Sequence, residues 1–310
     1  MAVNIKELSK NPDLLAGGHR ACLGCTGTTI IRQVLLAAGP NTVVCLATGC
    51  MEVVTTIFPY SAWRVPYIHC AFENAASVIS GVEAAYRALT RKGKITDPVN
   101  FIAIGGDGGT YDIGLQALSG ALERGHRFLY LCYDNEAYMN TGIQRSSATP
   151  LGAATSTSPA GKKIPGKQQN RKDLTAIAAA HNIPYVAQAS PAYWRDLIEK
   201  VRKALSKNGP SFMNVIMPCN RGWRFKEEEG IEQARWAVET CFWPLYEIDE
   251  GIYRITYKPK EKKPLVEWLK TQGRFKHLFA PGNEGIIKAL QEYVDRNWEE
   301  LLEKESKGSQ

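Results

Sequence analysis

The first two thirds of the chain alternate short apolar runs with longer stretches in which apolar residues recur at helical spacing. Short apolar runs are typical of buried strands, and the longer stretches are typical of amphipathic helices. The alternation predicts one α/β domain over residues 1–221, with a doubly wound and mostly parallel sheet. Strands are predicted at residues 42–47, 100–104, 127–133, 184–189 and 211–217, and helices at residues 26–39, 73–89, 112–125, 173–182 and 191–209.

Residues 222–310 follow a different pattern and are predicted to form a C-terminal extension. The last part of this region reads as a long charged helix whose apolar residues form a stripe. Such a stripe packs against another surface, so we expect the extension to pack on the domain or on partner subunits. The predicted elements are a helix at 230–243, a hairpin at 244–257 around an Asp-Glu-Gly turn, and a helix at 283–306. The stripe consists of Ile286, Ile287, Leu290, Tyr293 and Trp298.

Residues 151–172 lack periodicity and are rich in Gly, Pro, Ser, Thr and Lys, which predicts a long loop. Loops of this length are uncommon unless they are disordered or functional. Two interpretations therefore stay open, a solvated excursion and a lid or docking segment.

Composition and charge exclude several classes of function. The 310 residues are 44% hydrophobic, which is enough for a large core. The 38 Lys and Arg residues and the 31 Asp and Glu residues are scattered, with no basic run interleaved with aromatic residues, so no nucleic-acid partner is expected. The start of the chain is polar and mixed in charge, without a signal peptide or a membrane span, so we expect a cytoplasmic protein that binds no membrane.

A single acid lies within a cluster of glycines in the stretch GGDGGTYDIG, residues 105–114. Asp107 comes just after a predicted strand, and ligands of open parallel sheets bind beyond the carboxyl ends of the strands. Glycines admit a ligand close to the backbone, and a helix that begins near Asp112 favours a phosphate group at its first amides. A carboxylate beside a phosphate requires a cation between them, which points to Mg²⁺. By itself, such a cluster is more often a tight turn than a cofactor site.

A possible second ligand for this cation lies at the end of the next predicted strand. Asn135 follows Asp107 by 28 residues, and neighbouring strand ends can share one ion. The side-chain oxygen of Asn135 and the backbone carbonyl of Ala137 would complete the protein ligands. Asp112 and Asp134 are alternatives, but Asp112 is better placed to cap the following helix and Asp134 to support the turn.

Four of the eight cysteines occur where they could share a metal site. Cys22 and Cys25 form the stretch CLGC before the first long helix, and Cys50 and Cys219 follow predicted strands. Four thiolates fit zinc or an iron–sulfur cluster equally well by number, although this arrangement is unlike the paired CxxC motifs of a zinc ribbon. The remaining cysteines lie in apolar or aromatic stretches and are expected to be buried structural thiols, namely Cys45, Cys70, Cys132 and Cys241.

Two stretches carry a family resemblance that extends over nearly the whole chain. GGDGGTYDIGLQAL and YDNEAYMNTGIQRSSATP are similar to the beta subunits of pyruvate:ferredoxin oxidoreductase and its 2-oxoacid relatives, which use thiamine diphosphate. The resemblance implies that Mg²⁺ is bound by Asp107, Asn135 and the Ala137 carbonyl. It implies a 4Fe-4S cluster bound by Cys22, Cys25, Cys50 and Cys219. It also implies a cofactor-binding set that consists of Thr48, Gly49, Cys50, Gly106, Asp107, Gly108, Asn135, Ala137, Asn140 and Thr141.

The resemblance also implies a reaction and partners. The expected reaction is the oxidative decarboxylation of a small 2-oxoacid, with electrons passing through the 4Fe-4S cluster to ferredoxin and the acyl group passing to coenzyme A. Asn140 is expected to hydrogen-bond the reacting intermediate. In this family an alpha subunit supplies the glutamate that activates thiamine, so Glu52 and Glu73 are candidates here only by elimination. A further subunit with additional 4Fe-4S clusters and a dimer of heterooligomers are also expected.

The substrate and two rival functions stay open. Pyruvate is preferred because the motifs most resemble those of the pyruvate enzymes. Oxalate, which would yield no acyl group for coenzyme A, and other 2-oxoacids are the alternatives within the family. Outside it, the chain could be a thiamine diphosphate-dependent decarboxylase or carboligase without a redox centre, or a zinc-stabilised binding module.

Overall fold

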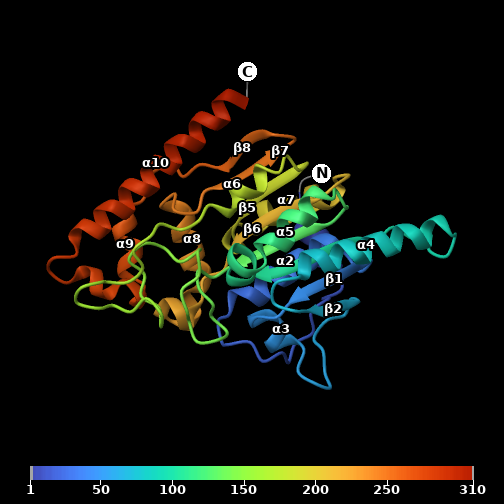
Figure 1. Cartoon of the computed structure of the whole chain (residues 1–310), viewed down its shortest axis with the longest axis horizontal. Helices are drawn as coiled ribbons and strands as arrows, with labels where there is room; N and C mark the ends of the chain where they lie inside the picture. The colour runs from blue at the N-terminus through green and yellow to red at the C-terminus, as the bar shows by residue number, and fades with distance from the viewer. Residues whose placement is uncertain (1–2, 309–310) are drawn as a thin grey trace.

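An eight-stranded sheet forms the centre of the computed structural model, which describes residues 3–308 (Figure 1). The strand order is β2-β1-β3-β4-β6-β5-β7-β8. Neighbouring strands are parallel from β2 to β5, and β7 and β8 are antiparallel at one edge. The predicted α/β fold with a mostly parallel sheet is confirmed. The strands are β1 (Thr42–Ala47), β2 (Tyr67–Cys70), β3 (Asn100–Gly106), β4 (Leu129–Asp134), β5 (Tyr185–Ala189), β6 (Ser211–Ile216), β7 (Leu245–Asp249) and β8 (Ile252–Tyr257).

The central strands are buried on both faces, which explains why their sequences read as continuous apolar runs. Every residue of β4, β5 and β6 is buried. Helices cover both faces of a parallel sheet, so strands in this position show no alternation of polar and apolar residues. The edge strand β8 differs, because most of its residues are exposed or half-buried.

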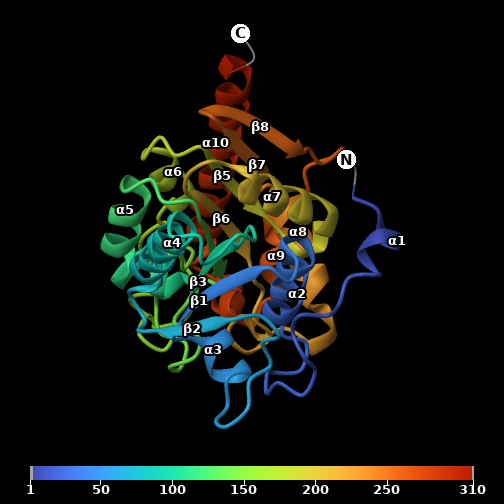
Figure 2. The same ribbon diagram turned by 90° about the vertical axis from the view of Figure 1, so that its right-hand side faces the viewer.

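Helices form a layer on each face of the sheet (Figure 2). α4, α5 and α6 lie on one face, and α2 and α7 pack together on the other. Within residues 3–308, no helix combines the length and the apolar character needed to cross a membrane. The α-helices are α1 (Ile5–Leu8), α2 (Thr26–Ala38), α3 (Cys50–Thr55), α4 (Ala75–Arg91), α5 (Leu115–Glu123), α6 (Leu174–Ala179), α7 (Trp194–Ser206), α8 (Gly230–Glu239), α9 (Leu265–Lys270) and α10 (Glu284–Gly308).

Helical structure after β3 begins earlier than the sequence predicts. A π-helix, η1 (Gly108–Ile113), directly follows Asp107 and precedes α5. Gly114 permits this wide turn to close tightly, because a Cβ atom there would lie 2.1 Å from the carbonyl oxygen of Gly109. Asp112 therefore lies inside the π-helix. The prediction that Asp112 caps the helix is wrong, since no side chain caps α5.

The C-terminal part of the chain continues the same sheet. β7 pairs with β5, and β7 and β8 form the predicted hairpin, whose turn holds Glu250 and Gly251 at φ 49° and 84°. The apolar stripe of α10 packs into a core cluster of this chain, where Leu290 and Trp268 are buried. The sheet therefore runs across the domain boundary predicted after residue 221, and the boundary itself stays a prediction.

Candidate active site

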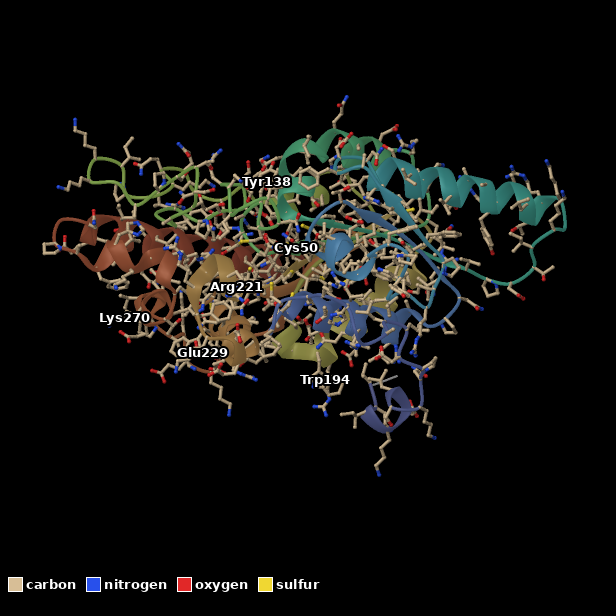
Figure 3. The ribbon with its side chains drawn as sticks, turned by 90° about the horizontal axis from the view of Figure 1, so that it is seen from below. Cys50, Tyr138, Trp194, Arg221, Glu229 and Lys270 are labelled. Carbon is tan, nitrogen blue, oxygen red and sulfur yellow. The ribbon has the colours of Figure 1, made fainter. Side chains whose placement is uncertain are left out.

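A cavity of about 250 Å³ lies at the carboxyl ends of β1, β3 and β4. All ten residues of the predicted cofactor-binding set line it. β3 and β4 are neighbours with Gly106 opposite Tyr133, which brings Asp107 and Asn135 to one edge of the sheet. Cys50, which lines the cavity, lies near the centre of the molecule in the view from below (Figure 3). The cavity is also lined by residues that the sequence did not predict, namely Phe72, Gly109, Tyr133, Tyr138 and Met139.

Three oxygen atoms converge at this cavity. The side-chain oxygen of Asn135 lies 2.9 Å from Oδ1 of Asp107 and 2.8 Å from the carbonyl oxygen of Ala137. In this orientation the amide oxygen faces two acceptors, and turning the amide over would convert both contacts into hydrogen bonds. In an octahedral Mg²⁺ site with bonds of about 2.1 Å, neighbouring oxygens are about 3.0 Å apart. The three oxygens therefore fit a divalent cation, which favours the observed orientation of the amide.

The carboxylate of Asp107 is buried and held by hydrogen bonds. Its Oδ2 accepts the hydroxyl of Ser146 at 2.5 Å, and its Oδ1 accepts the backbone N–H of Asn135 at 3.3 Å. Burial, followed by the negative charge of Asp134, raises the pKa of Asp107 well above its ordinary value. A cation beside the carboxylate would offset both effects.

The glycines around the cavity lie against aromatic rings. A Cβ atom at Gly106 would lie 3.0 Å from the ring of Tyr133, and one at Gly108 would lie 2.6 Å from the ring of Tyr138. A Cβ atom at Gly49 would lie 2.7 Å from the hydroxyl of Tyr133. The sequence predicted that the glycines admit a ligand to the backbone. In the structure they also admit the two tyrosines that line the cavity.

Two nearby carboxylates have structural roles outside the cavity lining. Oδ1 of Asp134 accepts the backbone N–H of Glu136 at 3.0 Å, which confirms the predicted support of the turn. Oδ2 of Asp112 accepts the hydroxyl of Tyr138 at 3.0 Å and the backbone N–H of Ser147 at 3.1 Å. Asp112 thus ties the π-helix to the following segment instead of capping α5.

The four predicted cluster cysteines come from three places in the fold. Cys22 and Cys25 lie in the turn before α2, Cys50 begins α3, and Cys219 precedes the short π-helix η3 (Asn220–Arg224). The N-caps of α2 and η3 are Cys25 and Cys219. The other four cysteines are buried, as predicted.

Hydrogen bonds between distant residues hold the CLGC turn against the turn of Cys219. The hydroxyl of Thr26 donates to the carbonyl of Pro218 at 2.9 Å, and Nδ2 of Asn220 donates to the carbonyl of Leu23 at 3.0 Å. These partners are 192 and 197 positions apart in the sequence. Gly24 lies so close to the same region that a Cβ atom there would be 1.9 Å from the carbonyl oxygen of Glu227. Tertiary contacts thus determine how the cysteines are arranged.

The cysteine thiols influence one another's ionisation. Burial raises the pKa of Cys25 to about 11 and that of Cys50 to about 12, and the neighbouring thiols add to both shifts. Burial also raises the pKa of Cys219, whose sulfur accepts the N–H of Gly222 at 3.4 Å. Within residues 3–308, no three His, Cys, Asp or Glu side chains are grouped to hold a single metal ion. In a 4Fe-4S cluster each thiolate binds a different iron atom, so its ligands need not converge on one point.

Neither glutamate that the sequence offered as an activating acid lines the cavity. Oε1 of Glu52 accepts the hydroxyl of Thr56 at 2.7 Å and lies 3.6 Å from Nδ1 of His69. Glu73 is exposed. Asn140 lines the cavity and is exposed, so its side chain lies where the cavity opens to solvent.

The long loop 151–172 contains no helix or sheet strand, but residues 152–155 and 166–167 are buried against the domain, whereas residues 159–164 between them are exposed. Lys167 is 2% exposed, and its Nζ donates to the carbonyls of Ser147 and Thr149 at 3.1 and 2.5 Å. Burial lowers the pKa of Lys167 to about 8. The interpretation of the loop as a solvated excursion is therefore wrong for these two buried segments.

Three residues that the sequence did not identify contact the turn and the carboxylate of the site, namely Ser146, Arg171 and Arg274. Ser146 lies within one of the stretches that carry the family resemblance, but nothing in the sequence pairs it with Asp107. Arg171 and Arg274 lie outside every motif. Nε1 of Trp223 donates to the carbonyl of Asn135 at 2.8 Å, a contact that only the folded chain shows.

Comparison with known proteins agrees with this geometry. The family model for the C-terminal TPP-binding domain of thiamine pyrophosphate enzymes matches residues 47–215. Pyruvate synthase subunit PorB from Thermotoga maritima is 54% identical, over 97% of this chain and 96% of that protein. The PorB subunit from Methanocaldococcus jannaschii is 56% identical, over 91% of this chain and 94% of that protein. Ketoisovalerate oxidoreductase subunit VorB from Pyrococcus abyssi is 47% identical, over 92% of this chain and 91% of that protein.

A solved structure of a 2-oxoglutarate:ferredoxin oxidoreductase from Magnetococcus marinus has a similar fold, with a TM-score of 0.55 over 72% of this chain and 79% of that chain. At 18% identity this likeness concerns the fold alone. The matched thiamine domain spans β3 and β4, which bring Asp107 and Asn135 to the cavity. The chain therefore belongs to the family of beta subunits of thiamine diphosphate-dependent 2-oxoacid:ferredoxin oxidoreductases.

Proposed function

We propose that this chain binds magnesium thiamine diphosphate and a 4Fe-4S cluster, and that with its partner subunits it oxidatively decarboxylates pyruvate. The pyruvate assignment follows the names of relatives that are more than half identical over almost the whole chain. One structural observation carries the proposal for the site. Cys50 lines the same cavity as Asp107 and Asn135, so the cysteine region and the oxygen ligands are adjacent.

The metal would be held by Oδ1 of Asp107, the side-chain oxygen of Asn135 and the carbonyl of Ala137. Thiamine diphosphate, when bound, supplies a nucleophilic carbon and an electron sink for cleaving the bond between a carboxylate and a carbonyl carbon. The hydroxyl of Ser146 donates to Oδ2 of Asp107, so Oδ1 would be the oxygen that binds the cation. Thr141, Gly106 and Gly108 are proposed to contact the diphosphate.

The remaining cavity residues would position the organic part of the cofactor and its substrate. Tyr133, Tyr138 and Phe72 give the cavity aromatic walls that exclude water. Asn140 lies at the open side and would donate a hydrogen bond to an oxygen of the 2-oxoacid. Thr48 and Gly49, which follow β1, would contact the cofactor beside Cys50.

The four cysteines would hold a cluster that accepts electrons one at a time. Hydrogen bonds from backbone amides to cysteine sulfur, such as that from Gly222 to Cys219, tune the potentials of such clusters. The CLGC turn and the Cys219 turn are hydrogen-bonded to each other, so bonds that involve no metal bring together cysteines that are far apart in the sequence.

The names of the relatives as subunits place this chain in a multisubunit enzyme. We propose that an alpha subunit covers the open side of the cavity and supplies the acid that activates thiamine, because Glu52 and Glu73 lie outside the lining. A further subunit with 4Fe-4S clusters would pass the electrons to ferredoxin. The complex would be a dimer of heterooligomers in the cytoplasm.

The test is an anaerobic purification of the complex followed by cofactor analysis. We expect thiamine diphosphate, magnesium and iron to be present, and reduction of methyl viologen when pyruvate and coenzyme A are added. Thiamine without iron would favour a non-redox decarboxylase. One zinc atom per chain without thiamine would favour a binding module.

The substrate is tested with a panel of 2-oxoacids in the same assay. Pyruvate, 2-oxoisovalerate, 2-oxoglutarate and oxalate are compared with and without coenzyme A. We expect the highest kcat/KM with pyruvate and a requirement for coenzyme A. Activity that is greatest with oxalate and independent of coenzyme A would replace the pyruvate assignment while leaving the site intact.

A further inference from the structure

We propose that Arg171 and Arg274 are positioning residues for the turn that carries Asn135 and Ala137, and that Trp223 links this turn to the turn of Cys219. The inference rests on the proposed function of the cavity. Neither arginine lines the cavity. Both lie outside the motifs, Arg171 at the end of the long loop and Arg274 in the 3₁₀ helix η5 (Gly273–Phe279).

Glu136, which lies between the two proposed metal ligands, is held by both arginines. Nη1 of Arg171 lies 3.0 Å from Oε1 of Glu136, and Nη2 of Arg274 lies 2.6 Å from its Oε2. Glu136 is fully buried and has φ 68°, a left-handed conformation that is rare for a residue with a side chain. Such a conformation persists only where the surroundings enforce it. The two ion pairs hold the side chain of Glu136 in place. Its backbone is held by the hydrogen bond from its N–H to Asp134 and by the hydroxyl of Thr149, which donates to its carbonyl at 2.6 Å.

Arg171 also holds the residue that starts the turn. Its Nη2 lies 2.5 Å from Oδ2 of Asp134, and the hydroxyl of Tyr111 donates to the same oxygen at 2.5 Å. The other oxygen of Asp134 accepts the N–H of Glu136. The guanidinium of Arg171 also packs on the ring of Trp243, 4.7 Å from its centroid. Arg171 thus fixes the turn on both sides of Asn135.

Arg274 is also connected to Asn135 through Trp223. Its guanidinium lies 3.9 Å from the ring centroid of Trp223, and Nε1 of Trp223 donates to the carbonyl of Asn135 at 2.8 Å. The backbone N–H of Trp223 donates to the carbonyl of Cys219 at 2.8 Å. One tryptophan therefore contacts both a proposed magnesium ligand and a proposed cluster ligand. A shift of Arg274 would move both.

The buried charges of this network balance. Asp134 and Glu136 carry the negative charges, and Arg171 and Arg274 carry the positive ones. A planar guanidinium can bond two partners at fixed angles, whereas the ammonium group of lysine acts as a point charge. Arg274→Lys should therefore keep the charge balance and lose the geometry. This distinguishes positioning of the turn from simple neutralisation of Glu136.

The experiment measures the Mg²⁺ concentration that gives half-maximal thiamine diphosphate binding to the anaerobic complex, for wild type, Arg274→Lys and Trp223→Phe. Loss of groups that orient metal ligands weakens metal binding by about 10- to 100-fold. We expect Arg274→Lys to raise the half-saturating Mg²⁺ concentration at least about tenfold, with binding restored at high Mg²⁺. Trp223→Phe should give a smaller increase and alter the electron paramagnetic resonance spectrum of the reduced cluster.

Lys200→Met is the matched control. Lys200 is 1% exposed and bonds Asp196, Thr256 and the carbonyl of Gln188, away from the cavity. It should lower thermal stability without changing the Mg²⁺ dependence. A defect of folding alone would lower the number of binding sites and leave the half-saturating Mg²⁺ concentration unchanged.

Three results would overturn the inference. The first is a half-saturating Mg²⁺ concentration that is unchanged in both Trp223→Phe and Arg274→Lys. If Arg274→Lys does not fold, an unchanged value in Trp223→Phe is enough to overturn the inference. The second is an equal increase in Lys200→Met. The third is a wild-type complex that binds thiamine diphosphate without Mg²⁺, which would also refute the proposed metal site. The wild-type measurement therefore separates failure of the proposed function from failure of the positioning role.

Discussion

The oxygen ligands and the cysteine ligands are assembled in different ways. Asp107 and Asn135 follow two strands that pair directly, so the sheet itself brings them together. The cysteines come from the turn before α2, from the start of α3 and from the turn before η3, and hydrogen bonds hold the first of these turns against the last. The pairing of β3 with β4 is thus enough to bring together the oxygen region, which consists of Asp107, Asn135 and Ala137. The cysteine region depends on packing between distant segments.

The strongest test of this comparison removes one ligand from each region. Asp107→Ala should abolish Mg²⁺-dependent thiamine binding and leave the iron content unchanged, because the carboxylate is the only charged oxygen of the three. Cys219→Ser should lose the cluster and leave thiamine binding intact. Metal analysis and thiamine quantification on the same samples check both. If each variant lost both cofactors, the two regions would not be independent.

The cysteine region should be more sensitive to backbone crowding. Gly24→Ala would place a Cβ atom 1.9 Å from the carbonyl of Glu227, at a residue with φ 70°. We expect a loss of about 3 kcal/mol in the free energy of unfolding and a low iron content. Denaturant unfolding and iron analysis measure the two effects. Gly17→Ala is the control, since a Cβ atom there has no neighbour within 4 Å, and an equal loss in that variant would refute the explanation.

The oxygen region should respond to loss of a single supporting bond. Ser146→Ala removes the hydroxyl that bonds Oδ2 of Asp107. We expect an approximately tenfold weaker Mg²⁺ affinity, with iron content unchanged. Titration of thiamine binding with Mg²⁺ measures this. Ser147→Ala is the neighbouring control, because the contact of Ser147 with Asp112 uses its backbone N–H. Unaltered affinity in Ser146→Ala would show that the bond does not orient the carboxylate.

The smallest effect is expected from one bond between the distant segments. Asn220→Ala removes the hydrogen bond to the carbonyl of Leu23. A single hydrogen bond contributes about 1 kcal/mol to stability. We expect the unfolding free energy of the protein without its cluster to fall by about this amount. In the protein with its cluster, we expect iron to be lost to a chelator faster than in wild type. Chelation kinetics that match those of wild type would mean that Thr26 and Pro218 suffice to hold the two turns.

The sequence predicted the oxygen region better than the residues that hold its ligands in place. Two continuous apolar runs, each followed by one of Asp107 and Asn135, identify an edge of the sheet, and the family resemblance names the ligands. Ser146 and Trp223 contact those ligands from segments that have no periodicity. The start of the helix after β3 was misplaced because a π-helix leaves no recognisable repeat in six residues.

By itself, the sequence determined which strands are buried and which residues follow them. Burial and secondary structure can be predicted in this way because they depend on the local pattern of apolar residues. Only the tertiary structure decided that residues 152–155 and 166–167 of the long loop pack inward, that Glu136 adopts a left-handed conformation between two arginines, and that Trp223 bonds Asn135. These features depend on contacts between residues far apart in the chain. The free energy of such contacts comes from burial and charge pairing in three dimensions, which no local pattern encodes.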